Sequence, residues 1–76
     1  MEFHQLKGLA ALAEAKSFTR AAQMTHVVQS TLSQQIRSLE EELGMQLVTR
    51  TTRRVELTAA GKTAVEYAKK LLKLRE

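Results

Sequence analysis

Apolar residues recur at helical spacing in the stretch 18–43, which reads as a short helix, a tight turn and a longer helix. The apolar positions of the longer helix share one narrow face: Leu32, Ile36, Leu39 and Leu43. The opposite face is polar and meets no acidic residue before Glu41; it consists of Ser30, Gln34 and Arg37, flanked by Thr31, Ser33 and Ser38. Such a helix fits the major groove of DNA, although an ordinary amphipathic surface helix has the same periodicity.

The residues before this helix favour a helix-turn-helix over about residues 18–37. Ser17 is a suitable N-cap for a helix that opens at Phe18. Its interior holds Ala21 and Ala22, whose small side chains let a second helix cross closely. The short helix is expected to stop near residue 25, and the longer one to begin about three residues later. His26 is assigned the positive-φ position that such a turn needs.

A first helix is predicted over about residues 3–15. Its expected buried stripe is Phe3, Leu6, Leu9, Ala10, Leu12 and Ala13, with Gln5 and Glu14 outside it. Gly44 is expected to end the longer helix as a left-handed cap. The acidic block 40–42 lies in the last turns of that helix, where it would repel phosphates. The N-terminal half of the helix is therefore the part expected to approach DNA.

After residue 45 the pattern becomes partly alternating and β-branched. Residues 47–50 and 55–57 are predicted to be short strands, joined by the polar tip 51–54. Two strands and a basic tip make a wing, over about residues 47–58. Arg53 and Arg54 at that tip are placed to enter a minor groove, whose negative potential favours guanidinium groups, although tip arginines can also be merely solvated.

A last helix is predicted from residue 59, capped by Thr58 and with Gly61 in its first turn. Its apolar stripe extends beyond what a wing and three helices need to cover, and consists of Ala64, Val65, Ala68, Leu71 and Leu72. This stripe predicts a linker and dimerisation helix over residues 59–76. The homodimer is expected to be weak at this helix length. Pairing of two such helices would set two recognition helices at a fixed spacing on a dyad-symmetric site. The pattern continues to residue 76 without a stop signal, which is typical of a piece of a longer protein.

Charge and composition narrow the range of possible binding partners. The 76 residues suffice for one small domain of net charge +4. Between residues 16 and 54 there are six basic and three acidic side chains, and the three acids are adjacent. This distribution suits a polyanion. Only two Phe and one Tyr could stack on unpaired bases, so duplex DNA is favoured over single strands.

The remaining chemistry is sparse. There is no cysteine, and His4 and His26 lack metal-ligand spacing. No glycine loop resembles a phosphate-binding motif. The longest apolar run, residues 9–13, is too short to cross a membrane. We therefore predict a cytoplasmic protein without catalytic residues, cofactor or metal.

Four ordered motifs together resemble the N-terminal DNA-binding domain of LysR-type transcriptional regulators. They are residues 17–22 (SFTRAA), 29–36 (QSTLSQQI), 39–44 (LEEELG) and 50–61 (RTTRRVELTAAG). The resemblance covers essentially the whole chain. It implies a mainly α fold, with a winged helix-turn-helix of three helices and a two-stranded wing in residues 1–58, followed by the linker helix. It also implies that a small-molecule effector would bind only through a C-terminal domain outside these residues.

By matching positions, the resemblance implies that the long helix reads bases and phosphates in the major groove. Arg53 would be the minor-groove arginine, and Arg50 would make a phosphate contact or an internal pair. The complete predicted DNA-binding set is Thr19, Arg20, Gln29, Ser30, Thr31, Ser33, Gln34, Arg37, Arg50, Arg53 and Arg54. The chain departs from the family at Val28, where Ser or Thr usually caps the recognition helix, and at Thr25 and Val48, which replace a usual leucine and phenylalanine.

These observations favour sequence-specific binding of double-stranded DNA by a bacterial LysR-type regulator. Two alternatives remain at this point. One is a non-specific, nucleoid-like DNA binder, which the net charge permits. The other is a helix-turn-helix module that binds protein. An enzyme is the least favoured class, since no catalytic constellation is present.

Overall fold

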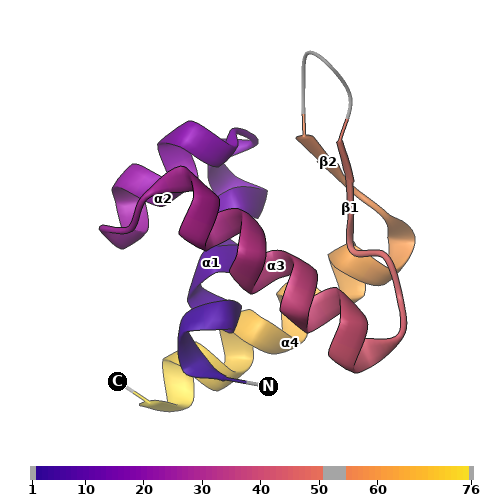
Figure 1. The fold of residues 1–76 in the computed structure, drawn as a ribbon. Helices are drawn as coiled ribbons and strands as arrows, with labels where there is room; N and C mark the ends of the chain where they lie inside the picture. Colours follow the sequence, from indigo (N-terminus) through magenta and orange to yellow (C-terminus); the bar gives the residue numbers. More distant parts are fainter. Residues whose placement is uncertain (1, 51–54, 76) are drawn as a thin grey trace.

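The computed structural model describes residues 2–50 and 55–75, and places four helices and one two-stranded sheet there (Figure 1). The elements in chain order are α1 (Phe3–Ala15), α2 (Phe18–Thr25), α3 (Gln29–Leu43), β1 (Val48–Arg50), β2 (Val55–Leu57) and α4 (Ala59–Arg75). This confirms the predicted mainly α class with a two-stranded wing. The predicted wing tip, with Arg53 and Arg54, lies outside the described residues.

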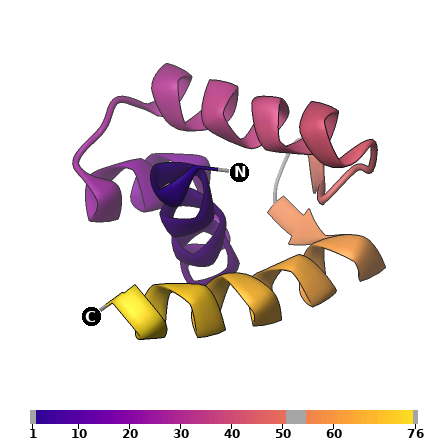
Figure 2. The same cartoon turned by 90° about the horizontal axis from the view of Figure 1, so that it is seen from below.

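Helix α1 is the centre of the fold. Figure 2 shows it enclosed by α2, α3 and α4, all of which it contacts. Because it packs on three sides, its buried arc is wider than a single amphipathic stripe, and the prediction for two positions was wrong. Gln5 is buried at 7% exposure, whereas Phe3 is 37% exposed. Burial of Gln5 is tolerated because its side-chain oxygen accepts a hydrogen bond from the Glu2 backbone N–H at 2.9 Å.

The helix ends follow the predicted local chemistry. The Ser17 hydroxyl accepts a hydrogen bond from the Arg20 backbone N–H at 3.2 Å and caps α2. His26 ends α2 with φ 61°, and Gly44 ends α3 with φ 68°, so both left-handed positions are confirmed. Lys16 adopts the same conformation after α1, which the sequence pattern did not indicate. These caps fix the angles at which α2 and α3 leave their neighbours.

The base of the wing is tied to both flanking helices. β1 and β2 pair antiparallel, with Val48 opposite Leu57. The Leu47 carbonyl accepts the Thr58 backbone N–H at 2.9 Å, and the Thr58 hydroxyl accepts the Gly61 backbone N–H at 3.0 Å. Thr58 therefore caps α4, as predicted, and anchors that cap to the strand base. The wing is thereby held between the end of α3 and the start of α4.

Helix α4 packs into the same core as α1, which corrects one expectation about its apolar stripe. Val65 and Ala68 are only 4% and 0% exposed, so the domain itself covers them and they offer no surface to a second copy. The physical reason is that α4 packs against α1, which it crosses in Figure 2. Ala64 and Leu72 are partly buried, and Leu71 is 43% exposed. The stripe therefore divides into an inner part and an outer part.

Candidate nucleic-acid interface

Helix α3 presents the polar face that the sequence predicted. Its apolar stripe faces the core: Leu32, Ile36 and Leu39 have 0% exposure, and Leu43 is half-buried. The other side is open to solvent: Gln29, Ser30, Thr31, Gln34 and Arg37 are exposed, and Ser33 is half-buried. The exposed set joins hydroxyl and amide groups with one guanidinium, and holds no carboxylate. It can donate to and accept from the edges of base pairs.

The start of α2 joins this face through one side-chain contact. The Thr19 hydroxyl donates to the side-chain oxygen of Gln29 at 3.0 Å. This bond fixes the Gln29 amide, whose NH₂ group is left as a donor. Arg20, next to Thr19, is exposed. The structure therefore brings the Thr19 side chain to the N-terminal end of α3.

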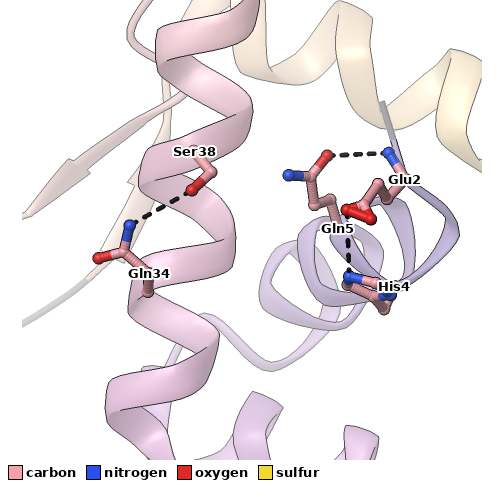
Figure 3. A network of polar contacts seen from close by, with 5 residues as sticks. All are labelled: Glu2, His4, Gln5, Gln34 and Ser38. Carbon is pink, nitrogen blue, oxygen red and sulfur yellow. Dashed lines mark hydrogen bonds and ion pairs between the residues drawn. The ribbon is translucent and has the colours of Figure 1, made fainter.

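A second edge of this face was not predicted from the sequence. The N-terminal turn of α1 and the polar side of α3 form an open hollow of about 360 Å³, lined by Glu2, His4, Gln5, Ser30, Thr31, Gln34, Gln35 and Ser38. Figure 3 shows the polar contacts on both sides of it. The Gln34 side-chain amide donates to the Ser38 hydroxyl at 3.3 Å, and His4 Nε2 lies 3.7 Å from a Glu2 carboxylate oxygen. No sequence spacing links residues 2–5 to residues 30–38, so only the fold reveals this border.

On the wing side, Arg50 has a partner within the chain. Its guanidinium carbon lies 5.0 Å from the centre of the Phe18 ring. This cation–π contact connects β1 to the start of α2. The sequence left Arg50 between a phosphate contact and an internal pair, and the structure supplies an internal partner that is aromatic. Arg50 remains exposed, so its guanidinium is still accessible from solvent.

The acidic block at the end of α3 does not act as one unit. One carboxylate oxygen of Glu40 accepts the backbone N–H groups of Leu47 and Val48, at 2.9 and 3.2 Å. Glu40 is half-buried, while Glu41 and Glu42 are exposed. Glu40 therefore also fixes the chain after α3, a role that the sequence pattern did not indicate. The polar face still begins at the acid-free N-terminal half of the helix.

Metal-binding clusters and membrane-spanning helices are absent from the described residues 2–50 and 55–75. There, no three His, Cys, Asp or Glu side chains gather as they would around a metal ion. No helix in those parts is long and apolar enough to cross a membrane. Within the described residues, the exposed polar face of α3 and its two borders are thus the main candidate site.

Known proteins resemble this chain over nearly its full length. It is 50% identical over 74 residues to the HTH-type transcriptional regulator TfdT of Cupriavidus pinatubonensis, covering 97% of this chain and 32% of that protein. It is 49% identical over 73 residues to the DNA-binding transcriptional dual regulator OxyR of Escherichia coli strain K12, covering 96% of this chain and 24% of that protein. The chain therefore spans a quarter to a third of the length of these relatives.

Solved structures show the same fold. The CbnR DBD–DNA complex superposes with a TM-score of 0.95 at 44% identity, covering 99% of this chain and 86% of that chain. The BenM DBD/benA site 1 DNA complex gives 0.90 at 45% identity, covering 96% and 82%. Both neighbours are DNA-binding domains in complex with DNA, and the helix pair α2–α3 with its two-stranded wing makes the shared fold a winged helix-turn-helix.

Residues 3–62 match the family of bacterial regulatory helix-turn-helix proteins described as the lysR family. That match includes α1, α2, α3 and the described wing strands. The chain belongs to this family.

Proposed function

We propose that this chain is the sequence-specific, double-stranded-DNA-binding domain of a bacterial transcriptional regulator, with α3 in the major groove. The observation that carries the proposal is the exposed, acid-free N-terminal half of α3, bordered by Thr19 and Arg20 on one side and by Arg50 toward the wing. Related domains of about 45% identity have been solved on DNA. The proposal assigns the chain no catalytic activity and places its action in the cytoplasm.

The roles of single residues follow from their positions. Ser30, Thr31, Ser33 and Gln34 are proposed to meet bases and phosphates in the major groove, together with Gln29 and Arg37. Arg53 is proposed to enter the minor groove, a role that rests on the family resemblance. Arg54, at the same wing tip, is proposed to enter the minor groove beside Arg53, and Arg50 is proposed to lie along the phosphate backbone. Phosphate contacts set the register on the duplex, and base contacts set the sequence preference.

Selection from a randomised duplex pool tests the proposal. The 76-residue chain should enrich a defined sequence, and its affinity for that duplex should exceed its affinity for random DNA by about 10³-fold or more at fixed salt. Equal affinities would indicate the non-specific, nucleoid-like alternative. Absence of any salt-dependent duplex binding would leave the protein-binding module as the better reading.

Replacement of Gln34 by alanine tests the recognition helix. A glutamine can pair bidentately with adenine, so Gln34→Ala should cost about 1–3 kcal/mol at one base position and relax the preference there. Affinities for single-base variants of the selected duplex give the measurement. Gln23→Ala, at an exposed position of α2, is the matched control and should change little. A loss that is uniform over all sequences would show that Gln34 touches only the backbone.

We further propose that two copies pair through α4. The outer side of α4 exposes Tyr67 at 63%, Leu71 at 43% and Leu74 at 83%. It borders an apolar groove of about 420 Å³ between α1, α3 and α4, whose lining includes Leu6, Leu43, Met45, Tyr67 and Leu71. A second α4 is the proposed occupant, because its own outer side carries the matching apolar residues. A pair of this kind would hold two recognition helices at a fixed spacing.

Leu71→Glu is expected to weaken this dimer by at least about tenfold, since it would place a carboxylate in an apolar contact. Sedimentation equilibrium of the free protein and the protein-to-duplex ratio of the complex are the measurements. Gln23→Glu adds the same charge on exposed α2 and should leave association unchanged. A wild-type chain that stays monomeric at high concentration and binds one copy per full site would overturn the α4 pairing.

A further inference from the structure

Val28 breaks two local rules at the start of the recognition helix. It is the N-cap of α3, yet no side-chain hydrogen bond caps the helix there. Serine, threonine, aspartate or asparagine would supply that bond and stabilise the helix. The valine side chain is also 65% exposed, so it gains little from burial. Residues that oppose local stability without a packing benefit are expected mainly at functional positions.

The chain on both sides of Val28 is firmly held. The backbone N–H of Val27 donates to the Ala22 carbonyl at 3.0 Å, and the Val27 side chain packs against the core. Gln29 is bound to Thr19 through its side chain. The Val28 carbonyl accepts the Leu32 backbone N–H at 3.1 Å, which starts the helix. The isopropyl group is β-branched and stiff, so it stands at a defined place beside Gln29 and Ser30.

The chemistry of a duplex identifies what this group could meet. The major groove offers one apolar feature, the C5-methyl group of thymine, and the residues at the start of a recognition helix are those that reach base edges. We propose that Val28 packs against the C5-methyl of a thymine and is a specificity-determining residue of the site. This inference rests on the proposed DNA-binding function.

Thr31 is the other residue of this helix end that could contact the thymine methyl group. It also carries a methyl group, is exposed, and lies one turn further along α3. Val28 is the better candidate because its isopropyl group has no polar atom, whereas Thr31 also offers a hydroxyl that can bond to a base or a phosphate. An experiment must therefore separate the two methyl sources.

Replacing thymine by deoxyuridine removes only the C5-methyl group and leaves every hydrogen bond of the base pair in place. The duplex selected from the random pool is resynthesised with deoxyuridine at one thymine at a time. We expect one position in each half-site where this change weakens binding of the wild-type chain by about three- to tenfold. Binding of the unmodified duplex by the same preparation is measured alongside.

Variants of Val28 and Thr31 then show which of the two residues contacts that methyl group. Val28→Ala should lose most of its discrimination between thymine and deoxyuridine at that position, because the truncated side chain no longer reaches the methyl. Thr31→Ser removes a methyl from the rival residue and should keep the discrimination. Val28→Ser should lose it too, while its melting temperature rises by roughly 4–8 °C because the hydroxyl caps α3. If Val28→Ser loses discrimination between thymine and deoxyuridine while its melting temperature rises, the loss cannot be due to poorer folding.

Three results would overturn the inference. They are an absence of any thymine sensitive to deoxyuridine, discrimination that survives in Val28→Ala, and discrimination that disappears in Thr31→Ser instead. In each case the wild-type chain would still prefer its selected duplex over random DNA, so the proposed function would stand. Failure of that preference itself would refute the proposed function and not the assignment of Val28 alone.

Discussion

Gly61→Ala is expected to destabilise the domain by about 3–5 kcal/mol, although alanine normally favours a helix over glycine by about 1 kcal/mol. A β-carbon at residue 61 would lie 2.0 Å from the Leu47 carbonyl oxygen and 2.9 Å from its carbon. That carbonyl cannot retreat freely, because it accepts the Thr58 backbone N–H at 2.9 Å. The α4 start and the wing base must therefore separate. Urea denaturation followed by circular dichroism gives the free energy of unfolding.

Gly8→Ala is the matched control within the same domain. Its β-carbon would meet the Leu32 Cδ1 atom at 2.8 Å and the Gln35 side-chain oxygen at 3.4 Å. Both are the far ends of flexible side chains, so a small rotation relieves the contact and the gain in helix propensity offsets its cost. We expect a change within about 1 kcal/mol. Equal losses for the two glycine variants would contradict the close approach of α4 to the wing base.

Glu40→Ala is expected to destabilise the domain by about 2–4 kcal/mol and to weaken DNA binding. The carboxylate accepts two backbone N–H groups, from residues Leu47 and Val48, whose side chains are 0% and 1% exposed. Alanine leaves both donors without this partner, so the connection from α3 to β1 loosens. Thermal unfolding and affinity for the selected duplex measure the two effects.

Two variants separate the effect of the Glu40 hydrogen bonds from the effect of losing a negative charge. Glu40→Gln keeps an oxygen that can accept both bonds but removes the charge, so it should lose about half as much stability as Glu40→Ala. Glu41→Ala removes an exposed carboxylate from the next position and should change stability by no more than about 0.5 kcal/mol. If Glu40→Ala behaved like Glu41→Ala, the role of Glu40 in holding the wing base would be refuted.

The exposure of the polar face of α3 was predictable because its determinants are local. The polar face of α3 follows from side chains spaced along one helix, whereas Thr19 and Arg20 entered the predicted set through the resemblance of residues 17–22 to the family. The border formed by Glu2 and His4 was missed. Its residues are far from α3 in the chain, and only the packing of α1 against α3 brings them together.

The sequence by itself determined the elements. Apolar spacing, the Ser17 and Thr58 caps and the left-handed residues His26 and Gly44 are local features, and each acts within about four residues. Such bonds join residues close together in the chain, so the local sequence carries the information that favours them. The bounds of the helices and strands were therefore predictable before any packing was known.

Only the tertiary structure decided which apolar, amide and acidic side chains turn inward. The burial of Gln5, Val65 and Ala68 depends on how many helices pack around α1. The periodicity of one helix does not reveal how many neighbours that helix will have. The inward turn of Glu40 depends on backbone N–H groups seven and eight residues further along, beyond the helix end. Burial and long-range hydrogen bonding depend on neighbours that meet only in the folded chain, so a local pattern cannot specify them.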